Sequence, residues 1–326
     1  MRLVVRRVGF FLVTLWAALT LNFFLPRLMP GSPADRIIAH LHGAVSQATV
    51  RAIEQSLGID TTQGIWQQYL TYLGHTASGN LGYSYSQGEP VSQVITGALP
   101  WTLGLVGITT VLAFVVGTAV GVVAAWRRGS RFDSVMPPLF VFTTAIPFFF
   151  VGMVLILIFS VKLGWFPDSG NVGQLTVPSF SPGYIGDVLY HAVLPALTLL
   201  ITSIGGWVLT MRNNMVTTLT EDYVRMARAK GLPSARVMVD YGARNAILPN
   251  LTGFAMSLGF VVSGAILVEY VFNYQGVGYY LLNAVGYNDY PLMQGLFLVI
   301  TVAVLLAILL SDIATAIIDP RTRTAG

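Results

Sequence analysis

The sequence has no cysteine, only two lysines and few charged side chains of any kind. Without cysteine the chain can form no disulfide, no thiolate metal site and no cysteine nucleophile. A P-loop that binds ATP phosphates needs a Gly-Lys-Ser/Thr sequence, whereas Lys162 and Lys230 follow valine and alanine. The chain therefore carries no such ATP site, and any ATP hydrolysis that serves it must take place on other polypeptides.

The scarcity of charge predicts a membrane protein. Charged residues make up 10% of the 326 residues and hydrophobic residues 54%, whereas soluble domains carry roughly 25% charged residues. Such a composition cannot cover a water-facing surface, so much of the chain must be solvated by lipid. A spanning helix needs about 20 mostly apolar residues. We therefore expect an all-α, polytopic fold with six spanning helices at Val8–Leu28, Leu99–Trp126, Met136–Ser160, Ala192–Met211, Leu251–Val271 and Pro291–Ile318.

The first apolar segment is predicted to be a retained helix rather than a signal peptide, because its core is longer than the roughly 7–15 residues of a signal peptide. With the N-terminus in the cytoplasm, 14 of the 18 basic residues fall inside, and both termini are cytoplasmic. This distribution explains the net charge of +4 by membrane orientation, so we expect no nucleic-acid partner. The outside segments keep only Arg27, Arg36, Arg51 and Lys162.

Two extracytoplasmic loops are long, Pro30–Ala98 and Lys162–Tyr190. The first is expected to contain a short helix over 45–59 and an aromatic segment suited to the lipid–water interface. The expected organisation has four parts: a first span with its outer loop (1–98), a transmembrane core (99–318), a cytoplasmic loop inside that core (213–249) and a cytoplasmic tail (319–326).

The segment Glu221–Pro249 is unusually basic for this chain. The spacing Thr218-x-x-Glu221 predicts a capping box at a helix start, and Gly231 followed by Pro233 predicts its end. Ser234 is expected to cap a second helix that runs toward Pro249. The apolar face of the first helix is predicted to consist of Leu219, Tyr223, Met226 and Ala227.

Two functions fit this helix, turn and helix on the cytoplasmic side. A basic amphipathic hairpin can rest on anionic lipid headgroups, and a capped, broken pair of helices can equally dock on another protein. Lipid attraction does not require a fixed break, so the shape favours docking, but the residues alone leave both open.

Other polar residues are weaker candidates. His40 and His42 could share a metal if they lay on a strand, but a solvated pair in a loop is the simpler interpretation, and no metal site is predicted. Glu269 and Asp312 lie close to the ends of their spans, where contact with water or a neighbouring helix explains them. Pro147 is expected to loosen or kink its helix. The residues chosen as candidates to line a wet pathway are Thr143, Thr144, Thr202, Ser203, Ser257 and Glu269.

Nearly the whole chain resembles the permease subunits of ABC importers of the peptide/nickel branch. The segment EDYVRMARAKGL is similar to their cytoplasmic coupling motif. Further matching segments occur in the family's order: LPRLMPGSPADRI, SGNLGYSYSQGEPV, VGVVAAWRRGSRFD, LGWFPDSG, LPALTL, ILVEYVFNYQGVGYYLLNAV, NDYPLMQG and IIDPRTR. The wider importer family has a Glu-Ala-Ala start six residues before the glycine of this motif, where this chain has Arg225, Met226 and Ala227. That departure puts in doubt any role taken over from the glutamate.

The resemblance implies a type I importer permease that forms half of a translocation pathway in a bacterial or archaeal cell membrane. It also implies a second homologous permease subunit, one or two ATPase subunits that bind ATP and Mg²⁺, and an extracytoplasmic substrate-binding protein, with lipid around the spans and no cofactor in this chain. The residues that it implies for ATPase coupling are Glu221, Asp222, Tyr223, Arg225, Met226, Ala227, Arg228 and Gly231.

Peptides are the expected cargo, ahead of oligosaccharides and nickel, because the helices offer many hydroxyls and no cluster of acids or histidines. An ion-coupled secondary transporter is a rival interpretation, but that class places ion-coupling carboxylates or broken helices near the midplane, and no acid is expected there. A membrane enzyme is a second rival. No nucleophile and base at matched depth supports it, so we do not expect an enzyme.

Overall fold

The structure is a computed structural model that describes residues 2–29, 64–173, 176–179, 181–263 and 265–318. The pair His40 and His42, the helix expected over 45–59 and the tail 319–326 lie outside these residues. The described part of the chain is helical apart from one short antiparallel pair, β1 (Tyr83–Ser84) and β2 (Glu89–Pro90). The all-α prediction is therefore confirmed.

Four helices are each long and apolar enough to cross a membrane. They are α1 (Arg2–Arg27), α5 (Val91–Trp126), α8 (Pro182–Thr218) and α15 (Tyr290–Ile318). With 36 residues, α5 is about 54 Å long and must extend beyond a hydrocarbon core of about 30 Å. The helix begins at Val91, eight residues before the expected start of the span.

Two further spans are broken. The first joins α6 (Arg131–Ala145) to α7 (Phe148–Leu155) and the π-helical η1 (Ile156–Lys162) with a bend of 94°. The second joins α10 (Ser234–Arg236), the π-helical η2 (Val237–Ala243) and α11 (Arg244–Ala246) to α12 (Leu248–Phe260) and η3 (Val261–Ser263) with a bend of 50°. The described residues thus contain four spans, or up to six if each bent pair is one span.

The third and fifth predicted spans, Met136–Ser160 and Leu251–Val271, are each interrupted, the third at Pro147, where a loosened or kinked helix was predicted. Pro147 has no N–H to donate and restricts the residue before it to extended backbone, so Ile146 has φ −84° and ψ 128° and α6 ends there. The fifth segment stops at Ser263, and α13 (Ile266–Val271) is a separate short helix. The remaining helices are α4 (Ile65–Ala77), α9 (Asp222–Ala229) and α14 (Val277–Tyr287).

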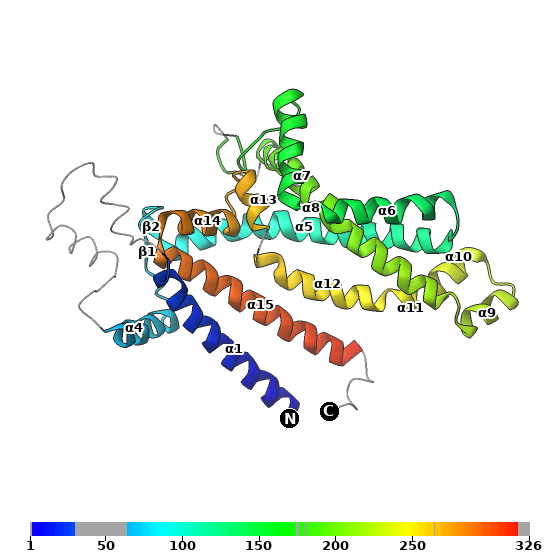
Figure 1. The fold of residues 1–326 in the computed structure, drawn as a ribbon, viewed down its shortest axis with the longest axis horizontal. Helices are drawn as coiled ribbons and strands as arrows, with labels where there is room; N and C mark the ends of the chain where they lie inside the picture. The colour runs from blue at the N-terminus through cyan, green and yellow to red at the C-terminus, as the bar shows by residue number, and fades with distance from the viewer. Residues whose placement is uncertain (1, 30–63, 174–175, 180, 264, 319–326) are drawn as a thin grey trace.

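The centre of the molecule is the pair α5 and α8, which Figure 1 shows crossing along the long axis with α6 beside them. Small residues allow this close approach. A Cβ atom on Gly117 would lie 2.7 Å from Trp207 Cβ, and one on Gly121 would lie 2.7 Å from the carbonyl oxygen of Val208. On the other side α1, α12 and α15 run side by side (Figure 1).

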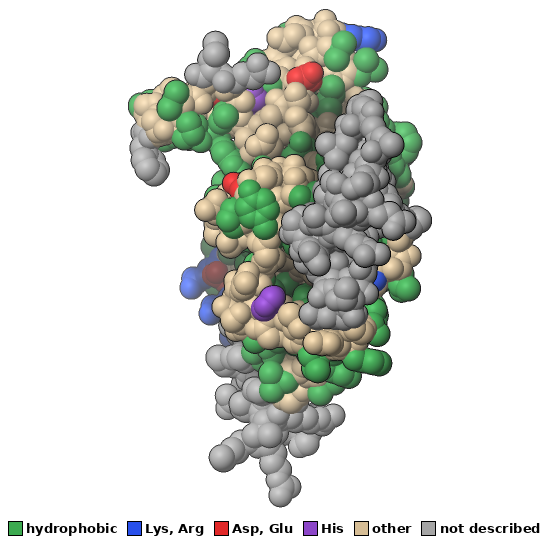
Figure 2. Space-filling view, turned by 90° about the vertical axis from the view of Figure 1, so that its left-hand side faces the viewer, with side chains coloured by type: hydrophobic (Ala, Val, Ile, Leu, Met, Phe, Trp, Pro, Cys, Tyr) green, Lys and Arg blue, Asp and Glu red, His purple; other side chains and the backbone are tan. Residues whose placement is uncertain are grey.

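The two ends of the molecule differ in charge. The turn between α5 and α6 and the segment from α9 to α11 lie together at one end, whereas β1, β2 and α14 lie at the other (Figure 1). Figure 2 looks onto the second end and shows few lysine or arginine side chains among the described residues. The basic loops at 127–131 and 225–244, which were predicted to share one side of the membrane, therefore lie at the same end of the fold.

Candidate functional site

The basic segment forms a compact hairpin, here called the basic hairpin (residues 221–246), that follows directly from α8. The predicted capping box is wrong, because α8 continues through Thr218. The Thr218 hydroxyl donates back to the carbonyl oxygen of Asn214 at 2.9 Å, and Glu221 stands at the start of α9 without a side-chain capping bond. A hydroxyl inside a helix often bonds the carbonyl four residues earlier. The Thr218 hydroxyl is used in this way and therefore does not cap α9.

The end of α9 is as predicted. Gly231 has φ +76°, a conformation that suits glycine and strains other residues. Its N–H donates to the carbonyl oxygen of Arg228 at 2.9 Å, and the N–H of Leu232 donates to that of Ala227 at 3.4 Å. These two bonds make a Schellman motif, which satisfies the last carbonyls of a helix and fixes the direction of the chain after it.

The predicted apolar face of α9 is half right, because Leu219 and Ala227 pack inward whereas Tyr223 and Met226 do not. The inward side consists of Val224 and Ala227, which are buried against Val237 with Leu232 beside them. Tyr223 and Met226 point outward, and 58% of Met226 is exposed. The prediction counted apolar residues at helical spacing from Leu219, but Val224 also lies three residues from Ala227, and packing against Val237 of the neighbouring arm buries it.

The second arm returns the chain to the spans. Ser234 is the first residue of α10 rather than its cap, because the preceding Pro233 already fixes an extended entry. The arm continues through η2, where a Cβ atom on Gly242 would lie 3.1 Å from Met215 Cε of α8. The Arg228 guanidinium lies 5.5 Å from the centre of the Trp126 ring at the end of α5. The basic hairpin is thus packed against the ends of both central helices.

Within the described residues, the outward side chains of α9 at Tyr223, Met226 and Arg225 have no partner other than one weak, solvated ion pair. Arg225 Nη1 lies 3.5 Å from Asp222 Oδ1, and both side chains are exposed; such pairs contribute about 0–1 kcal/mol. Of the eight residues predicted for coupling, seven are exposed and Ala227 is buried. The helix therefore exposes both polar and apolar side chains, and the Schellman motif at Gly231 fixes its end.

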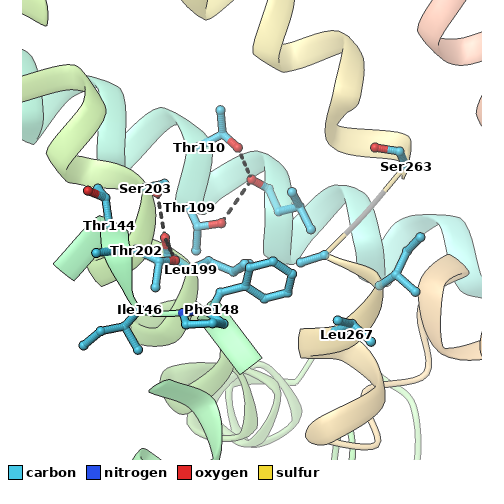
Figure 3. Close-up of a pocket in the computed structure, with 15 residues that line it drawn as sticks. Thr109, Thr110, Thr144, Ile146, Phe148, Leu199, Thr202, Ser203, Ser263 and Leu267 are labelled. Carbon is cyan, nitrogen blue, oxygen red and sulfur yellow. Dashed lines mark hydrogen bonds between the residues drawn. The ribbon is translucent and has the colours of Figure 1, made fainter. Parts of the chain in front are cut away.

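A cavity of about 830 Å³ lies at the α6–α7 bend and beside the point where η3 ends and α13 begins. Its lining comes from the middle of α5, the middle of α8, the α6–α7 bend and the residues around Ala265 (Figure 3). Three predicted pathway residues line this central pocket, Thr144, Thr202 and Ser203. The other three, Thr143, Ser257 and Glu269, do not.

The central pocket presents hydroxyl oxygens mainly as acceptors. Thr110 donates to the Val106 carbonyl at 2.7 Å and Ser203 to that of Leu199 at 2.6 Å; Thr109, Thr144, Thr202 and Ser263 bond backbone carbonyls in the same way. With their single proton used, these groups keep lone pairs for a guest. No charged side chain is among the lining residues. Thr110 and Ser263 were not chosen from the sequence, since nothing in it shows which hydroxyls face one cavity.

Glu269 has a different place. It is fully buried, and its carboxylate accepts from Thr102 Oγ1 at 2.8 Å and from the N–H of Gly278 at 2.7 Å at the start of α14. A carboxylate at a helix N-terminus satisfies amides that have no partner in the helix. The Thr102 hydroxyl also accepts from the N–H of Val277 at 2.8 Å. Glu269 thus joins α13, α14 and α5 at one point.

These features define a class: a multi-pass, all-helical membrane protein with a central pocket that carries several hydroxyls and a basic hairpin at one end of the fold. Comparison with known proteins gives the family. Residues 117–324 match the family described as the binding-protein-dependent transport system inner membrane component, and residues 1–106 match the N-terminal model of that membrane component. The chain belongs to this family and is a multi-pass inner-membrane protein.

The sequence is similar to those of individual relatives along nearly the whole chain. It is 35% identical to the di/tripeptide transport system permease protein of Pseudomonas aeruginosa over 98% of both chains. It is 35% identical to the oligopeptide transport system permease protein of Bacillus subtilis, over 90% of this chain and 91% of that one. It is 34% identical to the glutathione transport system permease protein of Escherichia coli over 98% of both chains.

Proposed function

We propose that this chain forms half of the translocation pathway of an ATP-driven importer of di- and oligopeptides. The observation that carries the proposal is the match, over nearly the full length, to permease proteins named for dipeptide, oligopeptide and glutathione transport. The central pocket supports it, because hydroxyl and carbonyl acceptors without charge suit the N–H groups that all peptides share. Selectivity would then lie mainly in a separate binding protein.

The partners follow from the same proposal. A second homologous permease subunit would supply the other half of the pathway, and an extracytoplasmic binding protein would deliver the cargo. One or two ATPase subunits would hold ATP and Mg²⁺, and this chain would hold no cofactor. Closure of the ATPase pair would move the basic hairpin and switch the spans between inward-open and outward-open states, which is coupling through a two-state element.

The exposed surface of α9 is the proposed docking site for an ATPase subunit. Tyr223 and Met226 offer apolar contacts beside the charged Asp222 and Arg225. The Schellman end at Gly231 and the contact of Arg228 with Trp126 would transmit force to α5 and α8. A hairpin that only rested on lipid would need the charge and the apolar groups, but not this rigid connection.

The uptake of labelled compounds by the reconstituted importer, with its cognate binding protein, tests the substrate. We expect ATP-dependent uptake of peptides across a range of lengths. Cello-oligosaccharides and nickel are the matched controls and should stay outside. Uptake of sugar or nickel with no uptake of any peptide would contradict the substrate while leaving the permease function intact.

We further propose that both termini and the basic hairpin are cytoplasmic and that the loop after η1 is extracytoplasmic. A membrane-impermeant maleimide tests this, because the chain has no native cysteine. Cysteine at Ser169, which is exposed, should react in intact cells, whereas cysteine at Ser234 should react only after permeabilisation. Asn171 is a poor site because it is buried and its oxygen accepts the N–H of Gln275 at 2.6 Å. Reaction at Ser234 in intact cells would overturn the orientation.

A further inference from the structure

A second cavity, apart from the central pocket, lies where α1, α4 and α15 meet. Its volume is about 300 Å³, and its polar lining includes Arg27, Tyr72, His75 and Asn80. An apolar groove of about 580 Å³ lies along the same three helices. Thr76 and Leu298 line both cavities, so the polar cavity and the apolar groove are direct neighbours.

Arg27 is the charged group of this site. Its guanidinium lies 3.6 Å from the centre of the Phe23 ring, and it donates to the Phe23 carbonyl at 2.8 Å and to Gln68 Oε1 at 3.4 Å. Within the described residues no ion pair to a carboxylate is formed by Arg27. A half-buried cation that is held in place by a ring and a carbonyl, and that has further N–H groups to donate, is suited to bind an anion.

The polar cavity and the apolar groove together extend over about the depth of one lipid leaflet. Along α1 the groove extends to Leu15, and along α15 it extends to Leu306. From Arg27 to Leu15 is a helical distance of about 18 Å at 1.5 Å per residue, and half of a hydrocarbon core is about 15 Å. The lining of the groove itself is almost wholly aliphatic: Leu15, Leu19, Leu73, Leu298, Val299, Val302, Ala303 and Leu306.

We propose that this site binds one anionic phospholipid, with the headgroup phosphate at Arg27 and one acyl chain in the groove between α1 and α15. Charge and shape agree, because the cation stands at the end of the groove where a headgroup belongs. The neighbouring α4 exposes Trp66 and Leu70 beside this site, as a helix lying in the membrane interface does. Such a lipid would hold α4 against the first and last spans.

The lipid accounts for these residues better than a peptide or a free anion does. A peptide has no use for a groove whose lining on α15, from Leu298 to Leu306, is aliphatic over about 12 Å, and a free phosphate has none for the groove at all. The chain's place in a membrane, which the family establishes, brings phospholipid to this surface at high concentration. The proposal requires a membrane protein but does not depend on which substrate is transported.

Native mass spectrometry of the purified importer, titrated with phosphatidylglycerol or phosphatidylcholine, tests the site. We expect wild type to retain one phosphatidylglycerol at concentrations where phosphatidylcholine is lost. Arg27→Gln should lower this retention by about tenfold, as a loss of roughly 1.4 kcal/mol in binding predicts. Ala303→Trp, which fills the groove and changes no charge, should lower retention as well. Arg128→Gln removes an exposed arginine at the opposite end and should change nothing.

Three results would overturn the proposal. Equal retention by wild type and Arg27→Gln would show that Arg27 does not bind the headgroup. Displacement of the lipid by inorganic phosphate would show that the site binds an ion and not a lipid. A benzophenone attached to cysteine at Ala303 should cross-link lipid. If it cross-linked a second protein subunit instead, the groove would be a protein interface. Peptide uptake by these variants is measured separately, so a failed lipid site and a failed transport function are distinguishable.

Discussion

Replacing Gly231 by valine should abolish transport while the protein still inserts into the membrane. At φ +76° a β-branched residue is strained by roughly 1–2 kcal/mol, and the Schellman bonds that end α9 would be lost with that conformation. Nothing lies within 4 Å of where a Cβ atom would stand, so the effect comes from the backbone and not from a clash. Peptide uptake and ATPase stimulation in the reconstituted importer measure it.

The matched control is Gly231→Asn. Asparagine tolerates the left-handed conformation far better than valine, and the open space around the position accepts its side chain. This variant should keep most of the transport activity. Normal uptake and normal ATPase stimulation in Gly231→Val would show that the turn geometry is not needed for coupling.

Phenylalanine in place of Ser203 should block the pathway. Ser203 is exposed to the central pocket, and its hydroxyl is already bonded to the Leu199 carbonyl. A ring at this position would fill space that cargo must cross. We expect peptide uptake to fall by at least about tenfold, the effect of an added barrier of ~1.4 kcal/mol, while assembly with the ATPase subunits is unchanged.

The Ser203→Ala variant separates the effect of side-chain volume from the effect of the hydroxyl group. It removes the hydroxyl but adds no bulk, so uptake should stay within about threefold of wild type, a difference below 1 kcal/mol. If the alanine and phenylalanine variants lost uptake equally, the hydroxyl itself would be the essential group. If neither lost uptake, the central pocket would not lie on the pathway.

The sequence predicted the helical class, most of the apolar segments and the end of α9 because each depends on local chemistry. A run of about 20 apolar residues can be satisfied only by lipid or a core, and Gly231 before Leu-Pro is a local stop signal. The end of α5 at Trp126 was also predicted, since the basic residues Arg127 and Arg128 follow it.

Features that depend on neighbouring elements could not be predicted. Which side of α9 is buried is decided by Val237 on the other arm. The Thr218 hydroxyl bonds a carbonyl within α8, which extends further than predicted, and so does not cap α9. The 94° bend at Pro147 was expected only as a loosening or a kink, because a proline removes one hydrogen bond without fixing the angle that packing then sets.

The candidate pathway residues show the same limit. Thr144, Thr202 and Ser203 meet in one cavity because two bent spans and the centres of α5 and α8 converge there. Glu269 was chosen as an acid near a membrane, but its carboxylate lies at the start of α14 and binds Thr102. Sequence indicates the polar groups of a span, whereas the rotation of each helix decides which of them share a cavity.

Photo-cross-linking from the outward surface of α9 tests the central claim most directly. The cysteine-free chain allows a benzophenone to be attached to a single cysteine at Met226, with cysteine at Arg128 on the α5–α6 turn as an exposed control at the same end. In the assembled importer we expect Met226 to cross-link an ATPase subunit strongly and Arg128 to do so weakly. A Met226 cross-link to lipid alone, with an intact ATPase complex present, would contradict coupling through the basic hairpin.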